Sequence, residues 1–178
     1  MNELSFKNEN KFRIHSKTLE YKLYDAIEEF EAYEDLIDEL ENLSEEDTLI
    51  LKLNSPGGRI DVGFMIIDAM QQSRGKVICQ VVHDACSMAG MIALAGDGLI
   101  LNKHTYVMLH DYSCLRYGKG HDLKLSSKAT DKMFSGRFKE ICIPFLTERE
   151  AESILKGEDF YIHDDDPSLE KRIKKHFM

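Results

Sequence analysis

The chain has 178 residues, of which 43% are hydrophobic and 31% charged, and 23 basic against 32 acidic residues give a net charge of −9. This length fits one domain, and the composition is ordinary for a soluble globular protein. The acidic balance argues against a protein that binds nucleic acid or an anionic membrane. No apolar run approaches the roughly 20 residues that cross a bilayer, and residues 1–11 lack the apolar core of a signal peptide, so we expect a cytoplasmic protein.

Most of the negative charge lies in one segment near the N-terminus. Between Asp25 and Asp47 there are 12 acidic residues and no Lys or Arg, which leaves 23 basic against 20 acidic residues in the remainder. Apolar residues recur from Ile27 to Leu43 at three- and four-residue steps, and this spacing predicts an amphipathic helix with one face against the core. Carboxylates on the opposite face are typical of a solvated helix surface.

Short β-prone runs alternate with amphipathic runs through the middle of the chain. The predicted strands are 48–53, 76–82, 99–101 and 106–110. The predicted helices are 60–70, 91–95, 122–142, 147–157 and 167–178. This alternation predicts an α/β fold with a mostly parallel sheet and right-handed crossover helices. We expect a single domain over residues 1–178, with a short N-terminal segment at 1–16 and a C-terminal helix at 167–178.

The cysteines and histidines give no sign of a metal site. Cys79, Cys86, Cys114 and Cys142 show no C-x-x-C spacing and mostly lie in apolar runs. We interpret them as free buried thiols of a reducing compartment. The seven histidines are scattered without a metal-binding pattern. We expect neither a metal nor an organic cofactor.

Three places combine residue types that serve catalysis. Gly57 and Gly58 follow a predicted strand and precede a helix, where backbone amides form a natural oxyanion site. Ser87 lies where a strand gives way to a buried small-residue helix, which places its hydroxyl at the positive end of the helix dipole. His110 ends a strand and could act as a general base. Taken singly, these features are more often a turn, a helix N-cap and a structural histidine.

Three short motifs occur in order along the chain: Asn54-Ser-Pro-Gly-Gly58, Ala85-Cys-Ser-Met88 and Val107-Met-Leu-His110. Together they resemble the patterns N-S-P-G-G, A-S-M-G and V-M-I-H of the ClpP family, the serine peptidases that form the proteolytic subunit of the Clp protease. The resemblance runs from about Leu23 to Asp166. It implies the crotonase-type fold of this family, with the helix at 122–142 as a handle for oligomerisation.

The resemblance also assigns roles by position. Ser87 matches the nucleophile and His110 the general base. Gly58 and Met88 match the residues whose backbone amides form the oxyanion hole. The loop Tyr117-Gly118-Lys119-Gly120 matches the glycine-containing handle segment, where a substrate would dock as an added strand.

The third member of the triad is open between two carboxylates. The family places an aspartate two residues before an aromatic residue, and Asp159 before Tyr161 fits this pattern. Glu158 before Phe160 fits if the register slips by one residue. We prefer Asp159, because Ile162 and His163 then take sensible strand and cap positions.

Two residues depart from the family pattern near the nucleophile. Ala89 stands where the family usually has glycine, and Asp84 adds a carboxylate that could raise the pKa of His110 or disturb the site. The short acidic helix and the compact ends are similar to those of divergent Clp-like subunits encoded by bacteriophages, which would act in the host cytoplasm.

The resemblance implies a serine endopeptidase that cleaves unfolded polypeptides without a cofactor. It also implies a homo-oligomeric ring, heptameric or double, with an AAA+ unfoldase as partner and with the acidic helix toward that partner. We expect no nucleic-acid or membrane partner. Two alternatives stay open. One is an inactive or regulatory ring subunit, and the other is an acyl-CoA enzyme of the crotonase superfamily, which shares the paired-amide oxyanion hole.

Overall fold

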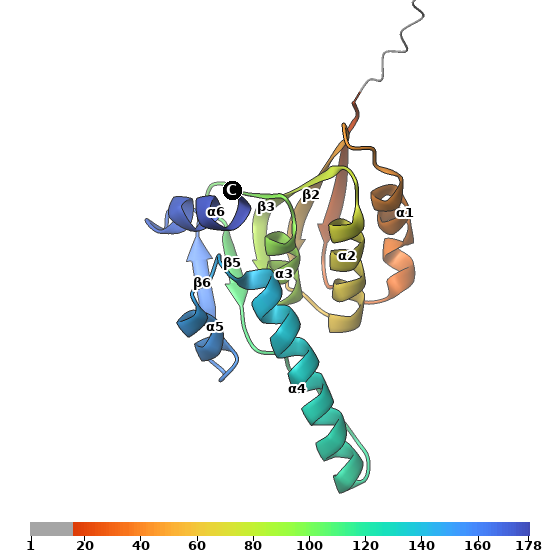
Figure 1. The fold of residues 1–178 in the computed structure, drawn as a ribbon, viewed down its shortest axis with the longest axis vertical. Coiled ribbons are helices and arrows are strands. Elements are labelled where there is room, and N and C mark those ends of the chain that lie inside the picture. The colour runs from red at the N-terminus through yellow and green to blue at the C-terminus, as the bar shows by residue number, and fades with distance from the viewer. Residues whose placement is uncertain (1–15) are drawn as a thin grey trace, which may run out of the picture.

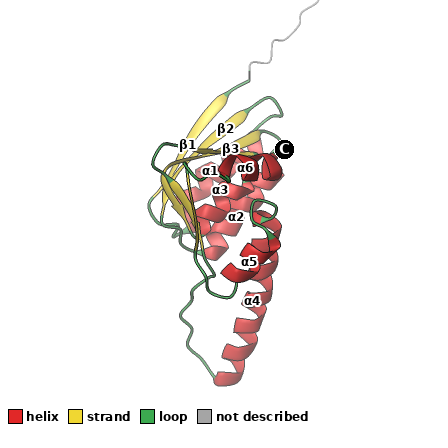
Figure 2. Cartoon of the chain, turned by 90° about the vertical axis from the view of Figure 1, so that its left-hand side faces the viewer, coloured by secondary structure: helices red, strands yellow, loops and turns green. Residues whose placement is uncertain are grey.

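The computed structural model describes residues 16–178, and what was expected for residues 1–15 lies outside this range. A six-stranded sheet forms one layer, and helices pack on one of its faces (Figure 1; Figure 2). The strands are β1 Thr18–Tyr24, β2 Thr48–Ser55, β3 Lys76–Cys86, β4 Gly98–Leu101, β5 Tyr106–Leu109 and β6 Phe160–His163. The helices are the 3-10 helix η1 Phe30–Tyr33, α1 Glu34–Asn42, α2 Ile60–Gln72, α3 Met88–Ala95, α4 Gly120–Cys142, α5 Glu148–Ile154 and α6 Leu169–Phe177.

The sheet is mostly parallel, as the alternation of predicted strands and helices indicated. Its order is β1-β2-β3-β5-β6, and β4 also pairs with β3. All pairings are parallel except that of β5 with β6. β3 is longer than predicted because its first half pairs with β4 and its last residues, from Asp84 to Cys86, pair with β5. The predicted α/β class is therefore confirmed, with one antiparallel edge strand added.

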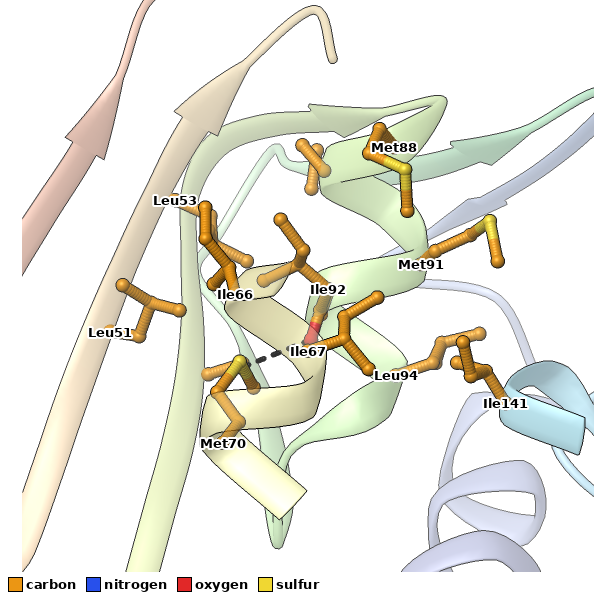
Figure 3. Packing of buried hydrophobic residues seen from close by; sticks show 14 of the residues in the cluster. Leu51, Leu53, Ile66, Ile67, Met70, Met88, Met91, Ile92, Leu94 and Ile141 are labelled. Carbon is orange, nitrogen blue, oxygen red and sulfur yellow. Dashed lines mark hydrogen bonds between the residues drawn. The ribbon is translucent and has the colours of Figure 1, made fainter. Parts of the chain in front are cut away.

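One face of the sheet carries the core. Along β2, buried residues alternate with half-buried ones, so that Leu49, Leu51 and Leu53 face the helices. Every residue of α3 from Met88 to Leu94 is buried, which confirms the helix predicted from its apolar run. Figure 3 shows α3 packed between α2 and the C-terminal end of α4, where Ile141 lies beside Leu94 of α3. The nucleophile candidate therefore precedes the most deeply buried helix.

The acidic helix is shorter than the sequence predicted. Its helical part begins at Phe30 in η1 and continues through α1 to Asn42, whereas a helix from Ile27 to Leu43 was expected. The reason is that Ile27 forms a parallel β-bridge with Gly58. The apolar stripe itself is confirmed, and Leu36 and Leu40 are fully buried. The carboxylates lie on the solvent face.

Helix α4 extends from the body of the molecule, and the loop that precedes it runs alongside it (Figure 1). It begins at Gly120, two residues earlier than predicted, and ends at Cys142. Its buried residues are Phe134, Phe138, Ile141 and Cys142, all in the C-terminal half. The N-terminal half of the helix is therefore largely in contact with solvent.

The thiols differ in part from the expectation. All four cysteines are free, and Cys79, Cys86 and Cys142 are buried as predicted, but Cys114 is exposed in the loop before α4. Burial raises the pKa of the Cys79 thiol to about 12, which makes it unreactive. In residues 16–178 no helix is long and apolar enough to cross a membrane.

The C-terminal helix α6 is fixed to the body by a half-buried histidine. The His176 ring accepts a hydrogen bond at Nδ1 from the Phe145 amide, with 3.1 Å between the nitrogens, and its Nε2 lies 2.8 Å from the Leu94 carbonyl oxygen. Because a backbone amide donates to Nδ1, the ring must be neutral with its proton on Nε2. Burial lowers the pKa of His176 below its ordinary value of 6.5. Leu94 belongs to α3, so this contact joins the C-terminus to the helix that follows Ser87.

We predict that acidification weakens this attachment. Below about pH 6.5 the unfolded chain binds a proton at His176 that the folded chain resists, so the free energy of unfolding decreases as the pH falls through this range. Urea unfolding at a series of pH values, followed by circular dichroism, measures the effect. In His176→Gln, which has an amide in place of the titrating ring, the slope between pH 7 and pH 5.5 should be smaller. An unchanged slope would contradict the contribution of His176.

Candidate active site

Three strand ends bring the candidate residues together. The carboxyl ends of parallel strands β2, β3 and β5 lie at the same edge of the sheet. Gly58 follows β2, Ser87 follows β3 and His110 follows β5. The topology therefore places at one edge three segments that are far apart in the sequence.

Ser87 has a backbone conformation that side chains rarely adopt. Its φ is 56° and its ψ is −122°, at a sharp turn from β3 into α3. Such a conformation costs about 1–3 kcal/mol and is found mostly at functional sites. The Ser87 amide donates to the Met108 carbonyl of β5 at 2.8 Å, and its carbonyl accepts from the Met91 amide at 3.1 Å. The hydroxyl makes no capping hydrogen bond to α3, so it does not serve as an ordinary N-cap.

The turn after β2 lies directly against Ser87. Gly57 has a φ of 90°, and a Cβ built there would be 2.5 Å from the Cys86 carbonyl oxygen and 2.7 Å from the Ser87 Cβ. Gly58 has a φ of 155°, and a Cβ there would be 2.0 Å from the Ile27 carbonyl oxygen. The paired glycines are therefore required by close approach on both sides of the turn.

Two backbone amides at this contact are available to a ligand. Ile27 forms hydrogen bonds with the residues on both sides of Gly58. Its amide donates to the Gly57 carbonyl, and its carbonyl accepts from the Arg59 amide, each at 2.8 Å. The amides of Gly58 and Met88 donate to no acceptor within residues 16–178. Met88 is the first residue of α3, where the amide has no partner inside the helix and the dipole favours negative charge. These are the properties of an oxyanion hole.

A cavity of about 50 Å³ joins these groups. It is lined by Gly58, Ile60, Ser87, Met88, Met91, His110, Tyr112, Ser113 and Phe134. The structure thus brings together four of the predicted site residues, Gly58, Ser87, Met88 and His110. The other lining residues were missed, because only their place in the fold, and no motif, relates them to Ser87.

Among the residues that line the cavity, the pKa of Tyr112 is shifted. The Tyr112 hydroxyl donates to the Asp131 carboxylate of α4, and this hydrogen bond raises the pKa of the Tyr112 phenol. Within residues 16–178, the Ser87 hydroxyl and the His110 ring share the cavity without a hydrogen bond between them. Catalytic hydrogen bonds are often long in free sites and shorten when substrate binds.

No group of three or more His, Cys, Asp or Glu within residues 16–178 could hold a metal ion.

The register of β5 with β6 relates His110 to the third candidate. Leu109 lies opposite Phe160, so that His110 and Asp159 take the next opposing positions beyond the ladder. The Glu158 carboxylate accepts a hydrogen bond from the Ser153 hydroxyl. Asp159 is exposed and lines a separate hollow with residues of α5, outside the cavity of Ser87. Neither carboxylate forms a hydrogen bond to His110 within the described residues.

The sequence of residues 11–159 matches the model of the family described as Clp protease. This match spans the strand ends that carry Gly58, Ser87 and His110 and extends to Asp159. The chain belongs to the Clp protease family. Members of this family are serine peptidases, so this membership accords with the strained serine and the free amides beside it.

Two departures from the family pattern are accommodated. Ala89 is fully buried in the core beside α3's other apolar residues. The Asp84 carboxylate is 3.1 Å from His83 Nδ1 and accepts a weak hydrogen bond from the Cys86 thiol at 3.7 Å. Asp84 does not line the cavity. The hydrogen-bond partners of its carboxylate lie on its own strand, and His110 is not among them.

The predicted docking loop lies away from the cavity. Residues 117–119 precede α4 and Gly120 begins it, at the distal end of that helix (Figure 1). Tyr117 is 87% exposed, and none of the four residues lines the cavity. The part of this loop that does reach the cavity is Tyr112 and Ser113, next to His110.

We predict that Gly57→Ala destabilises the fold by about 2–3 kcal/mol, because the added Cβ meets backbone atoms and the φ of 90° is strained for alanine. Gly136→Ala is the matched control. Gly136 lies inside α4 with no atom within 4 Å of the added Cβ, so this change should stabilise the helix by up to about 1 kcal/mol. Chemical denaturation of both variants measures the difference. Equal effects would contradict the close packing of the turn on Ser87.

Proposed function

We propose that this chain is a serine endopeptidase that hydrolyses peptide bonds of unfolded polypeptides. The observation that carries the proposal is the conformation of Ser87. Its backbone is strained, and its hydroxyl does not cap α3. Ser87 lines a cavity with His110 and with Gly58 and Met88, whose amides have no acceptor within residues 16–178. A serine with a purely structural role would not require a strained backbone, an uncapped helix and a place in such a cavity.

Each residue has a role in the proposed reaction. His110 removes the proton of the Ser87 hydroxyl as Oγ attacks the carbonyl carbon of the scissile bond. The amides of Gly58 and Met88 donate to the oxygen that becomes negative, and a donor of this kind contributes roughly 3–4 kcal/mol to lowering the barrier. His110 then protonates the leaving amine. Water then attacks the acyl carbon while His110 removes its proton. The ester bond to Ser87 breaks as His110 returns this proton to Oγ.

Asp159 is the proposed orienting carboxylate. A base in such a triad needs an acceptor for its second ring nitrogen, which fixes the tautomer and stabilises the imidazolium. The register places Asp159 opposite His110, and Glu158 is already bonded to Ser153. Asp159 is exposed, and we propose that its carboxylate turns toward the His110 ring.

Assembly is part of the proposal. Clp protease family members typically form ring oligomers, and we propose a homo-oligomeric ring for this chain, supplied with substrate by an AAA+ unfoldase in the cytoplasm. Helix α4 supports this, because its buried residues all lie in its C-terminal half while Leu125 and Met133 are 56% and 45% exposed. The role of Tyr117–Gly120 as a docking strand, and the bacteriophage-type subclass, rest on the sequence resemblance.

Labelling with a fluorophosphonate probe tests the nucleophile. The wild-type protein should form one covalent adduct, and Ser87→Ala should form none and should lose peptide hydrolysis by about a millionfold. Ser153→Ala, which removes an exposed hydroxyl outside the cavity, is the control and should label normally.

Failure of the wild-type protein to label would contradict the peptidase function. If the unlabelled protein also copurified with an active homologue, it would be a regulatory ring subunit instead. Turnover of an acyl-CoA thioester would identify the remaining alternative, a crotonase-type enzyme that uses the paired amides alone.

The two carboxylates can be separated by kinetics. We predict that Asp159→Asn lowers kcat by about 10⁴-fold, because the amide holds the His110 ring in the wrong tautomer. Glu158→Gln should leave kcat within about twofold of the wild-type value, since its bond to Ser153 survives as an amide contact. The reverse result would transfer the role to Glu158.

A further inference from the structure

A second hollow continues the active-site cavity toward α4. It is lined by Gly58, Arg59, Ile60, Asp61, Ser113, Arg116, Thr130 and Met133. Gly58, Ile60 and Ser113 also line the cavity of Ser87, so the two hollows adjoin, and the second is called the groove below. A peptide whose scissile carbonyl lies at Gly58 and Met88 would extend its neighbouring residues into this groove.

The two arginines of the groove differ in their partners. The Arg59 guanidinium is 2.7 Å from the Asp61 carboxylate and 2.8 Å from that of Glu29, so its charge is neutralised. The hydrogen bond from Arg59 in turn lowers the pKa of Asp61 to about 2, which keeps this pair ionised and mutually occupied. Arg59 and Asp61 therefore each already have a partner of opposite charge.

Arg116 keeps its charge. Its two terminal nitrogens donate to the hydroxyls of Ser126 and Thr130, one turn apart on α4. Both partners are neutral, and Arg116 forms no ion pair with any residue between 16 and 178. A guanidinium has five N–H donors, so two hydrogen bonds leave three for a ligand. Attachment at two points also holds the group in place before a ligand arrives, which reduces the entropy cost of binding.

We propose that Arg116 is a specificity-determining residue that selects peptides with an acidic side chain near the scissile bond. This inference rests on the proposed peptidase function. A carboxylate matches the guanidinium in charge and in the geometry of paired hydrogen bonds. The apolar remainder of the groove, Ile60 and Met133, accommodates the aliphatic part of a Glu side chain.

Paired peptides test the selection on the full-length protein. Each pair differs only by Glu or Gln at one position near the cleaved bond, and all are amidated at the C-terminus so that the side chain is the only variable carboxylate. We expect kcat/KM to favour Glu by about fivefold at one position or more, less at high salt because the groove is open to solvent. In Arg116→Gln the two peptides should be cleaved equally well. In Arg74→Gln, which removes an exposed cation outside the groove, the preference should persist.

A charge-reversal variant distinguishes a change of substrate selection from a loss of folding. Arg116→Glu should prefer a Lys peptide over its Gln counterpart, a gain that misfolding cannot produce. A free C-terminal carboxylate on the Gln peptide serves as a further arm. If it were selected in place of the Glu side chain, the assignment to an internal acidic residue would be wrong.

Binding separates this inference from the proposed chemistry. Fluorescence anisotropy of labelled Glu and Gln peptides with Ser87→Ala reports selection without cleavage. Tighter binding of the Glu peptide that Arg116→Gln abolishes would support the subsite even if the wild-type protein failed to react with the fluorophosphonate. Equal affinity for both peptides, or no binding of either, would overturn it even if Ser87 reacted normally.

Discussion

The site depends on one contact, the turn of Gly57 and Gly58 held between Ile27 and Ser87. On one side, Ile27 uses its amide and carbonyl to bind the groups that flank Gly58. On the other side, the Cα of Gly57 lies so close to Ser87 that no side chain fits between them. The remaining amide, that of Gly58, has no acceptor within residues 16–178, and Gly58 lines the cavity. The contact also explains why the acidic helix begins only after Ile27.

The strain at Ser87 is maintained by the elements around it. Its amide is bonded to β5, and the helix that follows is buried on all sides, so that neither flanking segment can relax. A cost of about 1–3 kcal/mol is small beside the burial of an entire helix. The strained conformation goes together with a Ser87 hydroxyl that forms no capping hydrogen bond to α3. The attachment of His176 to Leu94 extends this support to the C-terminus.

Sequence patterns predicted the elements that repeat a simple period. The β-prone run of β2 and the apolar run of α3 are local features, and the structure has both elements. The motifs also indicated Gly58, Ser87, Met88 and His110, which do share one cavity. What the sequence could not show was the bridge of Ile27 to Gly58, since it joins residues without a common pattern. The ion pair of Arg59 with Glu29 and the hydroxyl partners of Arg116 are likewise tertiary contacts.

The central claim is that Ser87 reacts while the amides of Gly58 and Met88 hold the developing charge. A crystal structure of the protein after reaction with a fluorophosphonate measures this directly. We predict phosphorus bonded to Ser87 Oγ, with its phosphoryl oxygen within hydrogen-bond distance of both amide nitrogens and with His110 beside the oxygen of Ser87. An adduct on another residue, or a phosphoryl oxygen directed away from the two amides, would contradict the account.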